Sequence, residues 1–254
     1  VNAAHTLHTN GQIAAVGAGA IAAVGTVNLN DVLSQTRAQV SNAKIGNEEK
    51  GATEFKVNST SHIDLNNNTG SISAGGASVG VGVSINTIND GSHSHIDHSD
   101  IFAQRISIDS KQDRTADLSA SSISAATALA AGTNIMITRV GSGEINSQEN
   151  ILEEKGGNKK TLESVIQSAN DLGSIDNANA EVANTVNSQK ASVATLAQVN
   201  NGVVVENSHL NSSTATVKAT DQTNIKMNTT TVTAGTGYSI NIPVAKVELK
   251  NNLV

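Results

Sequence analysis

Apolar residues recur in short alternating runs along this chain. The clearest run is VGVGVSI, residues 79–85, in which Val or Ile at every second position is separated by Gly or Ser. A period of two predicts a β-strand with one aliphatic face and one nearly bare face. Similar runs are RISIDS, VVVEN, TATVKA and NIKMN, with Asn, Asp, Gly and Ser turns between them. The pattern therefore predicts a chain built mainly of β-strands.

The aliphatic positions also repeat at fixed steps. Two sets of four aliphatic residues have the same internal steps of 5, 7 and 15 in residue number. The sets are Ile96, Ile101, Ile108 and Ile123, and Val205, Leu210, Val217 and Val232. An earlier set, Val40, Ile45, Val57 and Ile72, has steps of 5, 12 and 15, which places five extra residues in a polar loop around GNEEKGATEF. We expect the later positions to point into a core: Ile72, Ile96, Ile101, Ile108, Ile123, Val205, Leu210, Val217 and Val232.

These steps define a repeating unit and an insertion. The step in residue number from Ile72 to Ile96 is 24, whereas the equivalent step from Ile123 to Val205 is 82. The longer step therefore contains an insertion, which falls near residues 144–201. The undisturbed unit is about 51 residues, which we interpret as two solenoid turns of about 25 residues stacked about 4.8 Å apart. A gapless alignment of the segment from Gly11 with that from Gly70, at an offset of 59, also indicates a repeat.

Stacked coils explain this arrangement better than the alternative fold. An antiparallel sandwich could supply similar strands, but fixed steps with loops absorbed at one position favour a solenoid. The predicted fold is all-β, a parallel β-helix with a small α-helical insertion. The expected domains are solenoid over residues 1–143, helical insertion over 144–201, and solenoid again over 202–254.

The insertion changes to a helical period. Its clearest stripe is Leu162, Val165, Ile166, Ala169 and Leu172, which ends at Gly173. Short amphipathic helices cannot bury such a stripe alone, so it needs the flank of the solenoid or a partner protein. We therefore expect these five side chains to be candidates for partner binding. We also expect the insertion to protrude and to be removable without loss of the solenoid.

Composition narrows the possible functions. Aromatic residues make up 1% of the chain and hydrophobic residues 37%, so Val, Ile, Leu and Ala must form a narrow interior. The net charge of −6 gives no basic footprint for nucleic acid or anionic membrane. Without cysteine there are no disulfides and no thiolate metal sites. No signal peptide or long uninterrupted apolar run is visible, so we expect no membrane insertion, and the chain looks like part of something longer.

One histidine-rich segment, NDGSHSHIDHSD, could in principle hold a metal. On a strand, His93, His95 and Asp97 would share the outward face, as ligands of a zinc or nickel ion would. The equivalent segments TRAQVSNA and NGVVVENSH lack these histidines, so the fold does not need them. We therefore expect an exposed polar turn, including His98, and no bound metal or other cofactor.

An enzyme is the competing class, because many β-helices act on polysaccharides. Such sites need clustered carboxylates, a basic partner and usually aromatic platforms for sugar rings. The densest charged cluster here consists of Asp109, Lys111, Asp113, Arg114 and Asp117. Charges at such positions are usually solvated, and the chain has three aromatic residues in all. We therefore expect no catalytic residues.

Two segments resemble a known family of repeats: residues 75–132, which begin GGASVGVGVSINTIND, and residues 214–242, which begin TATVKATDQTNIKM. They are similar to the repeats of very large type V-secreted proteins of Gram-negative bacteria, namely haemagglutinin-repeat adhesins and leukotoxin-like exoproteins of the fusobacterial kind. The resemblance covers about 200 of the 254 residues and excludes the insertion. It implies a right-handed parallel β-helix that is secreted or displayed on the outer membrane. It marks no catalytic or receptor-contact residue.

The resulting expectation is a non-enzymatic, monomeric adhesin fragment that binds a protein or glycan receptor on host or bacterial cells. A segment of a secreted cytolytic toxin is the alternative, and a polysaccharide-acting enzyme is the third possibility. Lysis of host cells would distinguish the toxin, and turnover of a glycan would distinguish the enzyme.

Overall fold

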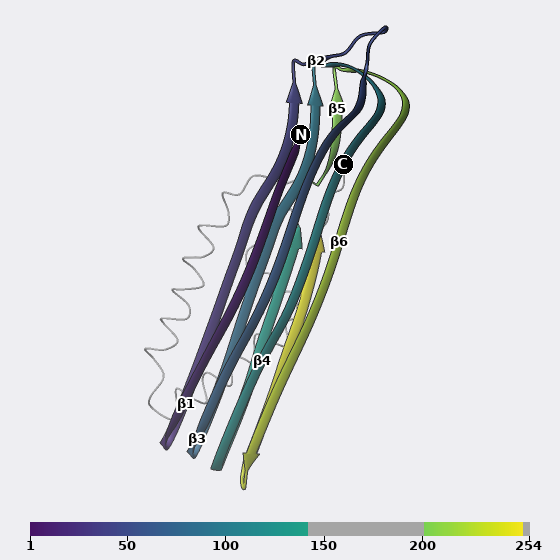
Figure 1. Cartoon of the computed structure of the whole chain (residues 1–254). Helices are drawn as coiled ribbons and strands as arrows, with labels where there is room; N and C mark the ends of the chain where they lie inside the picture. Colours follow the sequence, from purple (N-terminus) through teal and green to yellow (C-terminus); the bar gives the residue numbers. More distant parts are fainter. Residues whose placement is uncertain (142–200, 251–254) are drawn as a thin grey trace.

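Long parallel β-strands make up the described part of the molecule (Figure 1). The computed structural model describes residues 1–141 and 201–250. Its strands are β1 (Asn2–Ser41), β2 (Lys44–Ile45), β3 (Ala52–Asp97), β4 (Asp100–Gly141), β5 (Gly202–Glu206), β6 (His209–Gly235) and β7 (Tyr238–Lys250). Every pairing among them is parallel. The protein is therefore an all-β parallel solenoid, as the alternating runs predicted; the expected helical insertion lies outside the described residues.

Each coil is a long, flattened loop. In Figure 1, β1 runs from the N-terminus to the lower end of the molecule and returns, and β3 and β4 follow the same path. Side chains of one coil meet across its interior: Ser61 Oγ donates to Asp90 Oδ2 at 3.1 Å, and Asn67 Nδ2 donates to Asn86 Oδ1 at 3.1 Å. The chain of this coil therefore bends around residues 75–76. We call the part of each coil before its bend the first leg and the part after it the second leg.

Four coils are stacked in register. Their first legs are residues 2–18, 52–74, 100–125 and 209–234, and their second legs are residues 21–41, 77–97, 129–141 continued by 202–206, and 238–250. A leg of about 20 residues spans roughly 65 Å, whereas four rungs about 4.8 Å apart give a stack of roughly 15 Å between the outer strands. Within the described residues the solenoid is thus longer along its legs than along its stack.

The strand register confirms the repeated 5, 7 and 15 steps. Val40 pairs with Ile96, and Ile96 pairs with Val205, so the two equivalent sets lie side by side in the sheet. Val57 pairs with Ile108, one whole repeating unit further along the chain. Interpreting this unit as two turns was wrong, because hydrogen-bonded partners lie a full unit apart. The two halves of the unit are the two legs of one coil.

The gapless alignment at an offset of 59 was also wrong. Gly11 pairs with Asn67 and Asp31 with Thr87, which gives an offset of 56 in both cases. The two offsets differ by three, an odd number, so this slip would exchange the interior and exterior faces of the whole strand. The offset of 59 came from the similarity of two glycine-rich segments and would place buried residues beside exposed ones. The observed offset of 56, which pairs Val40 with Ile96, keeps buried residues beside buried residues.

Both departures from the regular unit fall where the steps placed them. Five extra residues lie in the loop between β2 and β3, since Ile45 and Ala52 pair with Ile101 and Ala103. In the third coil the register gains one residue at the bend, and the whole insertion falls between Val140 and Gly202. The register therefore resumes unchanged after the extra segment.

Three of the predicted core positions are fully buried. Ile96, Ile101 and Ile108 are 0% exposed and belong to one apolar cluster near the ends of the legs, against which Leu210 packs while partly buried. Val205 and Val217 pair with Ile96 and Ile108 but are 37% and 59% exposed. The second leg of the fourth coil is described only as far as Lys250, which pairs with Gly141. Beyond that point no described strand covers Val205 or lies across the interior from Val217.

The prediction was wrong for Ile72, Ile123 and Val232, which face outward and are 45%, 43% and 48% exposed. Near the bend, the neighbouring Ser71 and Ser73 are the buried residues, at 1% and 0% exposure. The two legs approach too closely there to admit an isoleucine between them. The apolar steps in this part of the sequence therefore mark the outer surface.

Glycine sets the small width of the interior near the bend. A Cβ atom added to Gly80 on the second leg would lie 2.8 Å from Ser124 Oγ and 3.3 Å from Ser71 Oγ on first legs. A Cβ atom added to Gly17 in the first coil would lie 2.5 Å from Cγ2 of Val24. Gly80 pairs with Val24, so at this level the first coil places a valine opposite Gly17, whereas the second coil places a glycine opposite serines. The bare face of the VGVGVSI run therefore faces inward, and its aliphatic face points out.

At the other end of the coils, the turns share one backbone conformation. Asn42, His98 and Asn207 occupy equivalent positions and have φ angles of 51°, 46° and 48°. Asn and His tolerate this left-handed conformation better than β-branched residues do. Backbone hydrogen bonds then link successive turns, as from Asn42 N to Asp97 O at 3.0 Å and from His98 N to Glu206 O at 3.3 Å. The segment containing His98 is thus a stacked turn.

Candidate functional site

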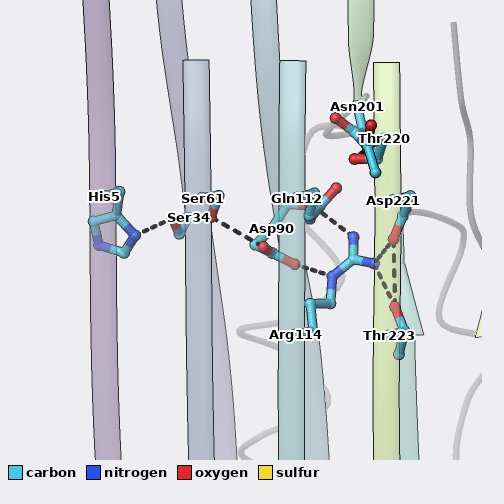
Figure 2. A network of polar contacts seen from close by, with 10 residues as sticks. All are labelled: His5, Ser34, Ser61, Asp90, Gln112, Arg114, Asn201, Thr220, Asp221 and Thr223. Carbon is cyan, nitrogen blue, oxygen red and sulfur yellow. Dashed lines mark hydrogen bonds and ion pairs between the residues drawn. The ribbon is translucent and has the colours of Figure 1, made fainter. Parts of the chain in front are cut away.

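The most densely charged part of the interior surrounds Arg114 (Figure 2). Arg114 stands in an interior ladder that reads Leu7, Ile63, Arg114 and Thr223 from the first coil to the fourth. Its Nε atom donates to Asp90 Oδ1, and its Nη1 atom donates to Asp221 Oδ1 at 2.8 Å and to Thr223 Oγ1 at 3.0 Å. The side chains of Arg114, Asp90 and Asp221 are 3%, 0% and 9% exposed. One cation therefore links carboxylates of the second and fourth coils.

Neutral side chains extend this network. Gln112 Nε2 donates to the Asp90 carbonyl oxygen at 2.6 Å, and Ser110 Oγ donates to Asn201 Oδ1 at 3.0 Å. Asn201 in turn donates through Nδ2 to the Thr220 carbonyl oxygen at 3.3 Å (Figure 2). Asn201 immediately precedes β5, where the chain re-enters the solenoid. The network therefore joins the coil that contains the insertion to the coils on both sides, and its buried groups indicate a structural role.

The carboxylates considered for catalysis do not converge. Asp109, Asp113 and Asp117 lie four residues apart on one leg of β4, so successive Cα atoms are roughly 13 Å apart. Glycosidases need two carboxyl groups within about 5 to 9.5 Å. Asp113 lies 3.6 Å from Nδ1 of His62, and Asp117 accepts a hydrogen bond of 3.0 Å from Lys226 Nζ. Arg114 turns into the interior, away from all three.

The histidine-rich segment forms a different arrangement from a metal site. His93 and His95 stack with ring centroids 5.7 Å apart. Arg37 Nη2 lies within hydrogen-bonding distance of His95 Nδ1, and His95 Nε2 lies 2.8 Å from Glu206 Oε1. Since Arg37 can only donate, the ring takes the tautomer in which Nε2 donates to Glu206. Both ring nitrogens of His95 therefore already have hydrogen-bond partners. The positively charged guanidinium of Arg37 would repel a metal ion that approached Nδ1.

The exposure of this segment differs from the predicted solvated turn. His98 is exposed at the turn, as expected, but His95 is only 7% exposed. Asp97 accepts hydrogen bonds from Asn207 Nδ2 at 3.3 Å and contacts His98 Nδ1. Among the described residues, no group of three or more His, Asp or Glu side chains is placed to hold a metal ion. The cluster instead ties together the first three coils, through Arg37, His95 and Glu206.

We expect His93 to make the stability of this end of the solenoid sensitive to pH. Burial lowers the pKa of His93 below its usual value, and the nearby Arg37 and His95 lower it further. The unfolded chain then binds the proton more readily than the folded chain, so His93 contributes stability above about pH 6.5 that is lost as pH falls through its folded pKa. We expect the melting temperature to fall between pH 7.5 and 5.5, and to fall less in His93→Gln.

The control for this measurement is His8→Gln, because the His8 side chain is 66% exposed on an outer face. Thermal unfolding followed by circular dichroism at several pH values distinguishes the two variants. Equal pH dependence in wild type and His93→Gln would contradict the assignment to His93.

The outer face of the first legs carries an exposed apolar patch. Val16, Ile72, Ile123 and Val232 form one ladder across all four coils, and Val16 is 75% exposed. The next outward positions form a ladder made entirely of alanine: Ala18, Ala74, Ala125 and Ala234. We call these eight residues the first-leg patch. Sequence reasoning missed it because it assigned the Ile and Val ladder to the core.

The five residues predicted to bind a partner all lie outside the described residues: Leu162, Val165, Ile166, Ala169 and Leu172. No stretch of the described chain forms a helix that is long and apolar enough to span a membrane.

Comparisons with known proteins found no matching family model, no matching curated protein and no matching solved structure.

Proposed function

We propose that this chain is a segment of a secreted or surface-displayed bacterial protein that works as a non-enzymatic binding scaffold. The resemblance of its repeats to those of type V-secreted adhesins supports this proposal, as does the spread of the carboxylates along β4. The partner is a receptor on the surface of a host or bacterial cell. The protein supplies a rigid binding surface and catalyses no reaction.

The observation that carries the proposal is the first-leg patch. Its aliphatic members are 43% to 75% exposed, and the surrounding outward positions are mostly polar, such as Asn68 and Asp117. Contiguous apolar surface with a polar rim is typical of interaction sites. Hydrogen-bonded ladders hold all eight residues in place, so binding loses little conformational entropy. The patch is therefore preorganised for a flat partner.

The chemistry of the patch favours a protein receptor over a glycan. Sugar rings usually stack on aromatic side chains, and this patch contains only Val, Ile and Ala. An apolar ladder instead buries well against aliphatic or aromatic side chains of another protein. We therefore propose a protein receptor with an exposed apolar surface.

Cell binding tests this proposal. Fluorescently labelled protein is added to cultured mammalian cells and to bacteria, and bound protein is measured. The variant Ile72→Asp/Ile123→Asp places two charges in the patch without touching the interior, and we expect about a tenfold or greater loss of affinity. Asn68→Asp/Ser119→Asp is the matched control, since it adds the same charge on the same face outside the patch.

Three outcomes would contradict the proposal. Binding that is equal in both double variants would place recognition elsewhere. Lysis of the cells at the concentrations used would favour the toxin alternative. Release of sugar from a glycan panel would show an enzyme.

A further inference from the structure

Two histidines on the outer face of the first legs form a close pair, although they are far apart in the sequence. His8 lies on β1 and His62 on β3, in neighbouring coils, with ring centroids 5.8 Å apart and ring planes at 70°. Their side chains are 66% and 36% exposed. Both rings therefore meet solvent on the same face as the first-leg patch.

Each ring is oriented by a carboxylate of the next coil. His8 pairs with Asp64 in the sheet, and its Nδ1 atom lies 3.2 Å from Asp64 Oδ2. His62 pairs with Asp113, and its Nδ1 atom lies 3.6 Å from Asp113 Oδ2. An ionised carboxylate can only accept, so each neutral ring carries its proton on Nδ1 and a lone pair on Nε2. Within the described residues, neither Nε2 atom makes a hydrogen bond or an ion pair.

Metal-binding histidines usually have this arrangement. Such a histidine coordinates the metal through one ring nitrogen and donates its other N–H to a carboxylate, which fixes the tautomer and makes the coordinating nitrogen more basic. At a Zn–N distance of about 2.0 to 2.1 Å, two rings on one tetrahedral zinc ion have centroids roughly 5 to 5.5 Å apart. The observed 5.8 Å is close to this spacing, and exposed side chains can rotate to reach it.

A second histidine pair in the same molecule shows that spacing alone does not make a site. The rings of His93 and His95 are also close, with centroids 5.7 Å apart. There, however, Arg37 and Glu206 contact the two ring nitrogens of His95. The charged groups that contact the first-leg pair are both carboxylates, and they leave one nitrogen of each ring available to a cation.

We propose that His8 and His62 bind one zinc ion through their Nε2 atoms, with Asp64 and Asp113 as positioning groups. The described residues place no third His, Asp or Glu side chain to complete the coordination, so water supplies the remaining ligands. The site is therefore open and exchangeable, unlike a closed structural zinc centre. This inference stands apart from the proposed function, because it concerns only zinc and four side chains.

Isothermal titration of the full chain, without an affinity tag, with zinc chloride tests the site. We expect one zinc ion per chain at this site and at least about a tenfold loss of affinity in His8→Gln and in His62→Gln. Asp64→Asn keeps both ligands but removes an orienting carboxylate, which should weaken binding by about 10- to 100-fold. Asp117→Asn is the matched control, since it removes the same charge from the outer face of the same leg and should change the affinity by less than about threefold.

Further measurements separate an imidazole site from other causes. His98→Gln removes a different exposed histidine, and it should leave the zinc affinity unchanged. Calcium prefers oxygen ligands, so calcium chloride should produce no binding heat. Absence of zinc binding would overturn the proposal, as would equal zinc affinity in wild type, His8→Gln and His62→Gln. Calcium binding that Asp64→Asn abolishes would also overturn it, by identifying a carboxylate site instead.

Discussion

Replacing Ile108 with aspartate is expected to unfold most of the protein at room temperature. Ile108 is 0% exposed, pairs with Val57 and Val217, and lies in an apolar cluster with Ile96 and Ile101. The substitution removes the packing of a buried isoleucine and places a carboxylate among apolar side chains. Each effect costs several kcal/mol, and together they approach the total stability of about 5 to 15 kcal/mol typical of proteins.

Urea unfolding followed by circular dichroism measures this loss. The matched control is Ser107→Asp, which adds the same charge one residue earlier on the outward face of the same strand. We expect Ser107→Asp to change the free energy of unfolding by no more than about 0.5 kcal/mol. An unchanged urea midpoint in Ile108→Asp would show that this cluster is not a core.

Replacing Arg114 with leucine is expected to cost about 3 to 5 kcal/mol, although leucine fits the position. Leu7 and Ile63 occupy the same interior ladder in the first and second coils, so the aliphatic side chain has a precedent there. The loss arises from charge, because Asp90 and Asp221 would keep their buried carboxylates without the guanidinium that now contacts both.

The first coil suggests how to rescue this variant. There Leu7 coexists with Ser34, which is the register partner of Asp90. Combining Arg114→Leu with Asp90→Ser and Asp221→Asn removes both orphaned charges, and we expect it to restore most of the lost stability. Arg105→Leu is the control, since its side chain is 59% exposed beside Glu54 and such pairs contribute at most about 1 kcal/mol. Failure of the triple variant to regain stability would contradict the electrostatic explanation.

The Arg114 network also accounts for how the solenoid accommodates a long insertion. The second leg of the third coil is interrupted between Gly141 and Asn201, close to where Arg114 needs a partner across the interior. Arg114 instead bridges Asp90 of the second coil and Asp221 of the fourth. The buried cation thus joins the coils on either side of the interruption.

The sequence alone determined the class of fold and which aliphatic positions of successive repeats are equivalent, although it did not show that one unit is a single coil or that the first offset is 56. Alternation at residues 79–85 predicted strands, because side chains on a strand point to opposite faces in turn. The equal steps that relate Ile96 to Val205 and Ile108 to Val217 predicted their pairing, because parallel coils in register require equal spacing. The polar loop of five residues and the resumption of the register after the insertion followed from the same arithmetic.

Only the tertiary structure decided which side of each strand is buried and which residues make the surfaces. Ile72 and Ile123 match the core steps in sequence but lie outside, because the two legs approach too closely at Ser73 and Gly80 to admit them. The partners of His95 also depend on the fold, since Arg37 and Glu206, both far away in the sequence, contact its ring nitrogens. A step pattern records distance along the chain, whereas the width of the interior and the partners of a side chain depend on legs that meet only after folding.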